Sequence, residues 1–261
     1  MMMKLIQKVE KNGDTWKYEY NGNGMMSKVI KPDEIEVTFK YDSLGRRIEK
    51  CSDEKTMKFV WDGNTILHEY FSENDSVELE NDSLVTWVFN GGFVPSAKIT
   101  SEGNYSIISN YLGTPVEAFD EEGNKVWSAE LDIYGKATEF KGEKDFIPFR
   151  YQGQYEDVEI GLYYNRFRYY DPEQGNYTQI DPIGLAGNNP TLYGYVNDPN
   201  IWVDPYGLTR STLTHYTNEK GLKGILESNA IRPSIGEKNA RFGPGQYFTD
   251  ISPDQIGSRT L

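Results

Sequence analysis

A tyrosine followed directly by Asn or Asp occurs twice near the start of the chain, and in both places a glycine lies three residues after the Asn or Asp. The two tyrosines, Tyr20 and Tyr41, are 21 residues apart. Between them Ile35, Val37 and Phe39 alternate with polar residues, and this period of two is typical of a strand with one buried face. The repeated unit predicts a strand, a tight turn and a second strand, which constrains this part of the chain to successive hairpins.

The turns of this unit have a chemical explanation. An Asp or Asn side chain can accept hydrogen bonds from the turn backbone, and glycine adopts the positive φ that such turns need. Weaker copies of the pattern lie at residues 59–63, 119–124 and 134–135. The 19 tyrosines and 25 glycines also favour many short strands joined by turns. An ordinary antiparallel sheet is the alternative, but the tyrosine-led spacing favours a repeat.

Charge and composition exclude several classes of protein. The net charge of −13 would repel nucleic acid phosphates and anionic membranes. Cys51 is the only cysteine, so the chain forms no intramolecular disulfide and has no CxxC metal signature. We predict no metal site and no nucleic acid partner. The sequence has no run of 18 apolar residues to span a membrane, and its first residues lack the apolar stretch of a Sec signal peptide.

Two copies of one motif, Asp-Pro-x-Gly-Leu, begin at Asp181 and Asp204. Two carboxyl groups brought face to face can share a proton, because both cannot ionise cheaply at short range. One can then activate a water molecule while the other acts as an acid toward the peptide. The alternative is structural, because Asp-Pro-x-Gly forms a good β-turn by itself. The spacing alone leaves both interpretations open.

The pattern changes after Leu208. Residues 213–217 are a short strand-like run, and residues 218–229 place apolar side chains at helical spacing. Residues 243–251 predict a glycine-rich turn and a second strand. Strand, helix, loop and strand indicate a new unit. The predicted fold class is therefore mainly β, with a small α+β unit at the C-terminal end.

Both the repeats and the later motifs resemble a known family. YNGNGMMSKVI and YDSLGRRIEK resemble the YD repeats of Rhs proteins, and residues 150–208 resemble the Rhs repeat-associated core domain nearly throughout. In that family the YD repeats coil into a hollow β-shell around a C-terminal toxin, and the core domain plugs the shell. The resemblance implies an antiparallel YD-repeat β-shell segment at 1–149, the core domain at 150–208, and the first part of a toxin domain at 209–261.

The resemblance also implies a role for the two motifs. The core domain of Rhs and related toxin-complex proteins is an intramolecular aspartyl protease that cuts after the second motif. Carried over, Asp181 and Asp204 are the catalytic pair, and the cut lies between Leu208 and Thr209. The family's supporting arginine matches Arg168, whose charge could hold one carboxylate ionised. Its alternative reading is a shell-surface arginine or a cation–π partner of the tyrosines that follow it.

Residues 209–261 resemble an ADP-ribosyltransferase of the His-Tyr-Asp type, a similarity carried by the runs HYT and RFGPGQYFTD. The resemblance implies NAD as the cofactor. It assigns His215 to the adenine-side ribose and Tyr247 to stacking on nicotinamide. Gly243 and Gly245 would let the backbone approach the dinucleotide.

The acid that such an enzyme needs is harder to place. Asp250 is the acid nearest the second strand, whereas the family's acid comes from a later strand. We therefore expect the catalytic acid beyond residue 261 and a truncated toxin domain that uses NAD only when complete. A lone His215 would read as a structural strand histidine, and the paired motifs favour the functional reading. His68 has no such partner motif and is predicted to be structural.

Two classes of function follow from these expectations. The first is a toxin effector, made in the cytoplasm and then secreted or delivered to a competing bacterium, whose autoprotease releases the ADP-ribosyltransferase. Its partners would be a cognate immunity protein, a component of the secretion apparatus and a target protein in the recipient cell. The second is a non-enzymatic Rhs shell remnant or interaction cassette, since a partial shell leaves sheet edges that invite association.

Overall fold

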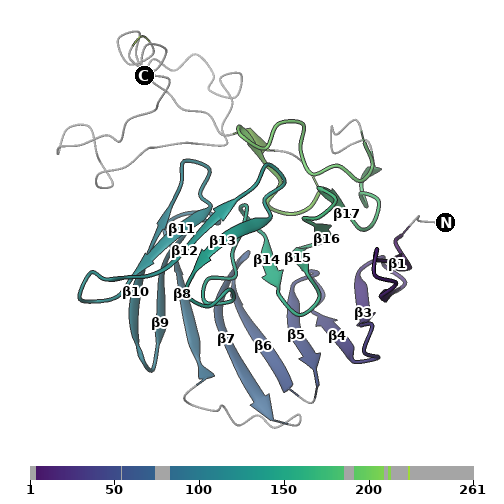
Figure 1. Cartoon of the computed structure of the whole chain (residues 1–261), viewed down its shortest axis with the longest axis horizontal. Coiled ribbons are helices and arrows are strands. Elements are labelled where there is room, and N and C mark those ends of the chain that lie inside the picture. The colour runs from purple at the N-terminus through teal and green to yellow at the C-terminus, as the bar shows by residue number, and fades with distance from the viewer. Residues whose placement is uncertain are drawn as a thin grey trace.

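The residues that the computed structural model describes are 4–53, 55–73, 83–184, 191–208, 211–212 and 223. Within them, nineteen strands form three antiparallel sheets (Figure 1). The outer sheet contains β1 to β13, each paired with its neighbours in chain order. The inner sheet contains β14 to β17, and β18 pairs with β19. The predicted fold class, a mainly β chain with an antiparallel shell segment, is confirmed.

The strand bounds show how short the repeating elements are. The outer-sheet strands are β1 (Gln7–Val9), β2 (Thr15–Tyr20), β3 (Met26–Ile30), β4 (Glu36–Tyr41), β5 (Arg47–Ser52), β6 (Lys55–Asp62), β7 (Thr65–Glu73), β8 (Val85–Phe89), β9 (Pro95–Thr100), β10 (Gly103–Ser109), β11 (Pro115–Phe119), β12 (Lys125–Leu131) and β13 (Ala137–Lys141). The remaining strands are β14 (Tyr155–Asp157), β15 (Leu162–Asn165), β16 (Arg168–Asp171), β17 (Asn176–Tyr177), β18 (Trp202–Val203) and β19 (Ser211–Thr212).

The predicted turn chemistry is present in the outer sheet. After β4, Asp42 Oδ1 accepts hydrogen bonds from the backbone N–H groups of Leu44 at 2.9 Å and Arg46 at 2.8 Å. The N–H of Gly45 donates to the carbonyl oxygen of Asp42 at 3.0 Å, and Gly45 has a φ of 75°. An Asx side chain and a glycine with positive φ therefore close the hairpin together. The turns that start at Asn110 and Asp132 repeat these bonds.

The two tyrosines that precede the turns at Asn21 and Asp42 connect neighbouring parts of the outer sheet. Tyr41 Oη donates to the carbonyl oxygen of Met26 at 2.7 Å, and Tyr20 Oη donates to that of Leu5 at 2.9 Å. Strand register shifts by one residue at both tyrosines, as in a β-bulge. Each tyrosine thus bonds to the backbone 15 residues earlier in the chain. This contact gives the tyrosine-led spacing a physical reason.

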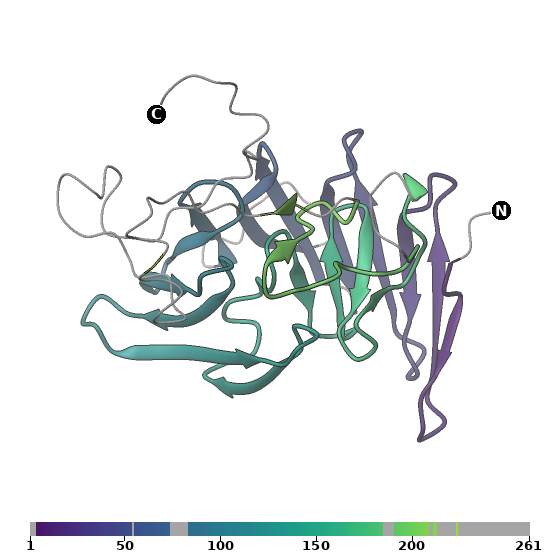
Figure 2. The same ribbon diagram turned by 90° about the horizontal axis from the view of Figure 1, so that it is seen from above.

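The outer sheet curves around the inner sheet, which lies on its concave side (Figures 1 and 2). Strand β4 alternates between the two faces as predicted, with Val37 and Phe39 buried. Phe39 packs on Tyr169 with ring centroids 5.3 Å apart, and Phe59 meets Tyr155 edge-on at 5.5 Å. Outer and inner sheets therefore share one hydrophobic core.

The inner sheet is buried on both faces, since every residue of β15 and β16 is buried. Its charged residues must then be paired, because an unpaired buried charge is strongly destabilising. Arg47 of β5 forms a buried ion pair with Asp157 of β14, and Lys50 Nζ lies 3.1 Å from the same carboxylate. This pair connects the outer sheet to the inner sheet at one place.

Some predictions from the sequence concern boundaries and residues on which the described structure does not bear. The domain boundaries after residues 149 and 208 stay predictions. The predicted helix and second strand of the α+β unit lie outside the described residues, apart from Lys223. In the part of the chain that the structure describes, no helix has the length and apolar character to cross a bilayer.

Candidate active site

The β15–β16 hairpin and two Asp-Pro turns converge at the inner sheet. Arg168 is the first residue of β16, Asp181 follows β17, and Asp204 follows β18 directly. Their side chains are almost wholly removed from solvent, with exposed fractions of 1% for Arg168 and Asp204 and 2% for Asp181. Three buried ionisable side chains in one place make this cluster a candidate site, because burying charge carries a large desolvation penalty.

One nitrogen of Arg168 joins the two aspartates. Arg168 Nη2 lies 3.0 Å from Asp181 Oδ2 and 3.1 Å from Asp204 Oδ2. The two carboxylates are therefore within about two hydrogen-bond lengths of each other. The structure brings together all three residues that the sequence analysis proposed for self-cleavage, and their catalytic roles stay predictions. Arg168 is not a surface arginine, and its guanidinium lies 3.6 Å from the ring centroid of Tyr177 rather than over the tyrosines that follow it.

Each aspartate also opens a turn, so the two interpretations of the motif are compatible. Asp204 Oδ1 accepts a hydrogen bond from the N–H of Leu208 at 2.9 Å, and the N–H of Gly207 donates to the Asp204 carbonyl at 3.3 Å. Asp181 Oδ1 accepts from the N–H of Ile183 at 2.9 Å. In both residues Oδ1 serves the turn and Oδ2 contacts Arg168.

Tyr177 and Asn165 complete the cluster, and the sequence analysis missed both. Tyr177 Oη donates to Asp204 Oδ2 at 3.0 Å. Asn165 Nδ2 donates to Tyr177 Oη at 2.7 Å and to the Asp204 carbonyl at 3.0 Å. A signal for Asn165 was available, because it is three residues before Arg168 and pairs with it across a two-residue hairpin turn. Tyr177 had no such local signal.

The backbone that leads to Leu208 is tightly held. Arg168 Nε donates to the carbonyl oxygen of Gly207. Gly207 has a φ of +64°, and a Cβ at this position would lie 2.5 Å from the carbonyl oxygen of Asn165. Only glycine fits such a close approach with a positive φ. The residue before Leu208 is therefore fixed against the same hairpin that carries Arg168.

Burial changes the proton affinity of the cluster. Desolvation raises the pKa of Asp204 to about 6, against the opposing effects of Arg168, the Leu208 N–H and Tyr177. Desolvation also raises the pKa of Asp181, and Arg168 opposes it there. Burial raises the pKa of Tyr177 well above its usual value, so its hydroxyl stays a donor. Asp204 can therefore hold a proton close to neutral pH beside a second carboxylate.

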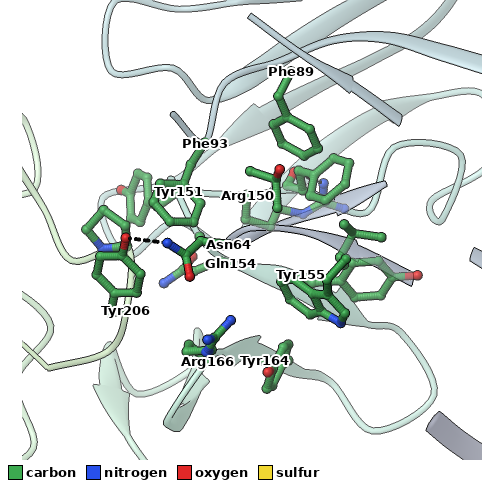
Figure 3. Close-up of a pocket in the computed structure, with 16 residues that line it drawn as sticks. Asn64, Phe89, Phe93, Arg150, Tyr151, Gln154, Tyr155, Tyr164, Arg166 and Tyr206 are labelled. Atoms are coloured by element: carbon green, nitrogen blue, oxygen red, sulfur yellow. Dashed lines mark hydrogen bonds between the residues drawn. The ribbon is translucent and has the colours of Figure 1, made fainter. Parts of the chain in front are cut away.

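A pocket lies beside the second motif, between the outer sheet and residues 150–166 (Figure 3). Outer-sheet aromatics including Phe89 and Phe93 line one side, and Pro205 and Tyr206 of the motif line the other. Asn64 Nδ2 donates to Tyr206 Oη at 3.1 Å, the bond drawn dashed in Figure 3. The variable residue of the second motif thus faces the outer sheet.

The residues proposed for NAD, namely His215, Gly243, Gly245 and Tyr247, lie outside the described residues. Their roles stay predictions. Among the described residues, no group of three His, Cys, Asp or Glu side chains could hold a metal ion. His68 Nδ1 lies 2.9 Å from Thr86 Oγ1, a strand-to-strand contact that agrees with a structural role.

Two family descriptions match the chain. Residues 7–193 match the Teneurin YD-shell, and residues 213–260 match the HYD1 signature containing ADP-ribosyltransferase. The first match includes the outer sheet, the inner sheet, Arg168 and Asp181. The second covers His215, Gly243, Gly245 and Tyr247.

Curated relatives are much longer than this chain. The probable deoxyribonuclease RhsA of Dickeya dadantii is 34% identical over 254 residues, which cover 94% of this chain and 17% of the relative. The toxin protein Tse5 of Pseudomonas aeruginosa is 29% identical over 238 residues, covering 78% of this chain and 18% of the relative. The chain therefore spans less than a fifth of the length of either relative.

Solved structures share the fold. The Photorhabdus luminescens Tc holotoxin pore matches with a TM-score of 0.61 and 21% identity, over 78% of this chain and 10% of the matched chain. The complex TcdB2-TccC3 without its hypervariable C-terminal region matches with a TM-score of 0.61 and 23% identity, over 74% and 10%. At 21% and 23% identity, these similarities concern the fold alone.

Proposed function

We propose that residues 150–208 form an aspartyl autoprotease, because this chain belongs to the Teneurin YD-shell family. The chain is an Rhs YD-repeat polymorphic toxin region with an ADP-ribosyltransferase signature. The cut lies between Leu208 and Thr209. The observation that carries the proposal is the position of Arg168 Nη2 between the Oδ2 atoms of Asp181 and Asp204.

The chemistry needs one protonated and one ionised carboxyl group. We assign the proton to Asp204, because burial raises its pKa to about 6, and the base to Asp181. Asp181 takes a proton from a water molecule as the water oxygen attacks the carbonyl carbon of Leu208. Asp204 gives its proton to the nitrogen of Thr209 as the carbon–nitrogen bond breaks. The products are a carboxyl group on Leu208 and a free amino group on Thr209.

Arg168 supports this chemistry by position and charge. It contacts both carboxylates through Nη2 and the Gly207 carbonyl through Nε. The charge favours one ionised carboxylate while burial keeps a proton available to the other. The contact to Gly207 holds the peptide that precedes the cut beside the same two acids.

The part that begins at Thr209 is proposed to act as an ADP-ribosyltransferase toxin that uses NAD. His215 would bind the adenine-side ribose, Tyr247 would stack on nicotinamide, and Gly243 and Gly245 would admit the dinucleotide. Such an effector is secreted or delivered by a secretion apparatus, modifies a target protein in the recipient cell, and is neutralised by a cognate immunity protein. The name of the relative Tse5, a toxin protein, supports this class of function.

Intact mass spectrometry of the purified full chain tests the protease. The wild type is expected to give two masses that match a cut after Leu208, whereas Asp181→Asn and Asp204→Asn each give one uncut mass. Asp198→Asn is a matched control, because Asp198 also precedes a proline and its Oδ1 accepts from the Asn200 N–H at 2.9 Å, a contact within its own turn. An uncut wild type would contradict the protease and favour a non-enzymatic shell segment.

A further inference from the structure

The two Asp-Pro-x-Gly-Leu motifs differ at their variable residue. Ile183 of the first motif has an exposed fraction of 41%. Tyr206 of the second motif is half-buried and packs against the outer sheet. The ring of Tyr206 meets that of Phe93 edge-on, with centroids 5.3 Å apart. An edge-to-face aromatic pair is a favourable and orientation-dependent contact, so it fixes direction as well as position.

The contacts to Tyr206 come from two separate turns of the outer sheet (Figure 3). Asn64 lies in the turn between β6 and β7 and donates to Tyr206 Oη from 142 residues earlier in the chain. Phe93 lies in the turn between β8 and β9. These two turns adjoin in space only when the hairpins of the outer sheet are paired, because β7 and β8 hydrogen-bond to each other. Tyr206 can therefore contact Asn64 and Phe93 at the same time only in the assembled sheet.

The backbone beneath Tyr206 is held from the opposite side. Gly153 has a φ of +83°, and a Cβ there would overlap the carbonyl oxygen of Pro205. The N–H of Phe167, in the β15–β16 turn, donates to the Tyr206 carbonyl at 3.4 Å. Tyr206 is thus held between the outer sheet and the core domain.

We propose that Asn64 and Phe93 of the outer-sheet turns position the second motif for cutting through their contacts with Tyr206. Self-cleavage then depends on an assembled outer sheet. This inference rests on the proposed autoprotease. Leu208 is two residues from Tyr206 and its N–H is bonded to Asp204. A shift of about 1 Å at a reacting bond can cost roughly a hundredfold in rate. Tyr206 is a positioning residue here, whereas Ile183 of the first motif is exposed.

The test follows cleavage of the newly synthesised full chain over time in cell-free translation, by intact mass, because the purified wild type is expected to be cut already. Phe93→Ala and Tyr206→Ala are each expected to cut about tenfold more slowly than the wild type. Tyr206→Phe keeps the ring and loses the hydroxyl, so its rate should fall less. Tyr111→Ala is the control, because Tyr111 is an exposed aromatic residue in the β10–β11 turn and should cut at the wild-type rate. A wild-type rate in Phe93→Ala overturns the proposal.

A double variant separates a shared contact from general damage. If Phe93 and Tyr206 act through each other, Phe93→Ala/Tyr206→Ala should cut no more slowly than Tyr206→Ala. Slowing that multiplies the two single effects shows independent action and overturns the proposal. Asn64→Ala, an exposed change with little risk to folding, should keep the wild-type melting temperature and still slow cutting about threefold.

A readout without cleavage distinguishes this inference from the protease itself. In the Asp181→Asn background Leu208 stays joined to Thr209, and amide hydrogen exchange reports on the Leu208 N–H. Exchange is expected to be about tenfold faster when Phe93→Ala is added. An unchanged exchange rate would show that Phe93 does not position the second motif through Tyr206, whether or not the wild type cuts itself. An uncut wild type with faster exchange in Phe93→Ala overturns the protease, and cleavage control with it, but shows that Phe93 still holds the second motif in place.

Discussion

Aspartates of the outer-sheet turns and aspartates of the Asp-Pro turns make the same backbone contacts in different surroundings. At both Asp120 and Asp204, the N–H three residues later donates to the aspartate carbonyl, and the N–H four residues later donates to Oδ1. Their proton affinities nevertheless move in opposite directions. Hydrogen bonds from Asn124 lower the pKa of Asp120, whereas burial raises that of Asp204 to about 6.

The comparison shows that the turn itself does not set the pKa of its aspartate. The same turn closes hairpins in the outer sheet and presents Asp204, directly after β18, beside Arg168 of the inner sheet. What changes is that Asp204 is buried and that its second oxygen contacts Arg168 and Tyr177. Four substitutions, in order of decreasing expected effect, test this comparison.

Arg168→Met should have the largest effect. It leaves Asp181 and Asp204 buried without their shared cation, so cleavage should stop and the free energy of unfolding should fall by about 3–5 kcal/mol. Mass spectrometry and urea unfolding measure the two effects. The matched change in an outer turn is Arg46→Met, whose partner Asp42 is partly solvent-exposed, and it should cost less than about 1 kcal/mol. Similar losses for both variants would erase the contrast between the regions.

Asp204 should show its raised pKa as a dependence of stability on pH. Its folded pKa of about 6 exceeds the usual aspartate value of 3.8, so its protonation favours the folded state. That contribution is complete below about pH 4 and is lost as pH rises through about 6. Asp181 adds to the rise in this pKa, so in the uncut Asp181→Asn background the loss between pH 4 and pH 7, relative to the chain with Asp204→Asn, should be below the full shift, about 2 kcal/mol.

Urea unfolding at a series of pH values measures this difference in the free energy of unfolding. If both chains showed the same dependence of stability on pH, Asp204 would not have a raised pKa in the folded state.

An aspartate of the outer sheet should show a pH dependence of the opposite sign. Because the pKa of Asp120 is lowered, its contribution to stability is present above its ordinary pKa and is lost as pH falls. Asp120→Asn should accordingly matter more at neutral pH than in acid.

Tyr177→Phe should shift the pH dependence of cleavage. If Asp204 supplies the proton, wild-type cutting slows as pH rises through about 6. Tyr177 donates to Asp204 Oδ2 and so lowers its pKa, and removing the hydroxyl should move the midpoint up by about one pH unit. Tyr170→Phe is the control, since Tyr170 Oη donates to the Tyr134 carbonyl instead. A midpoint that stays in place or moves down would remove Tyr177 from the cluster.

Asp132→Ala should have the smallest effect. Its Oδ1 accepts from the N–H groups of Tyr134 at 2.8 Å and Lys136 at 3.0 Å, so it closes a turn as Asp204 does. Losing these bonds in an exposed turn should cost about 1 kcal/mol in urea unfolding. Cleavage should continue at the wild-type rate, and slower cutting would show that the Asp132 turn also contributes to cutting.

Local patterns were sufficient to predict the outer sheet. Each hairpin is encoded by residues close in sequence, such as the alternation that buries Val37 and Phe39 and the Asx turn at Asp42. The docking of the inner sheet was not predictable in this way. Arg47 and Asp157 are 110 residues apart, and neither has a sequence neighbour that announces the pairing.

The site was predictable to the extent that its residues repeat or match a known motif. The repeated motif revealed Asp181 and Asp204, and the family resemblance supplied Arg168. Tyr177 is one of 19 tyrosines, and its contact with Asp204 depends on the strand register and on a turn 27 residues later. No pattern along the chain distinguishes it from the tyrosines that only fill the core.

The ion pair of Arg47 and Asp157 also bears on the order of assembly during translation. Outer-sheet strands pair only with neighbours in the chain, so each hairpin can form soon after it leaves the ribosome. Asp157, the partner of Arg47 in the ion pair, is synthesised 110 residues after Arg47. We expect the inner sheet to dock last among these parts, onto a surface already prepared for it. The direction of synthesis would thereby delay the meeting of Arg168 with its two acids until the curved sheet has formed.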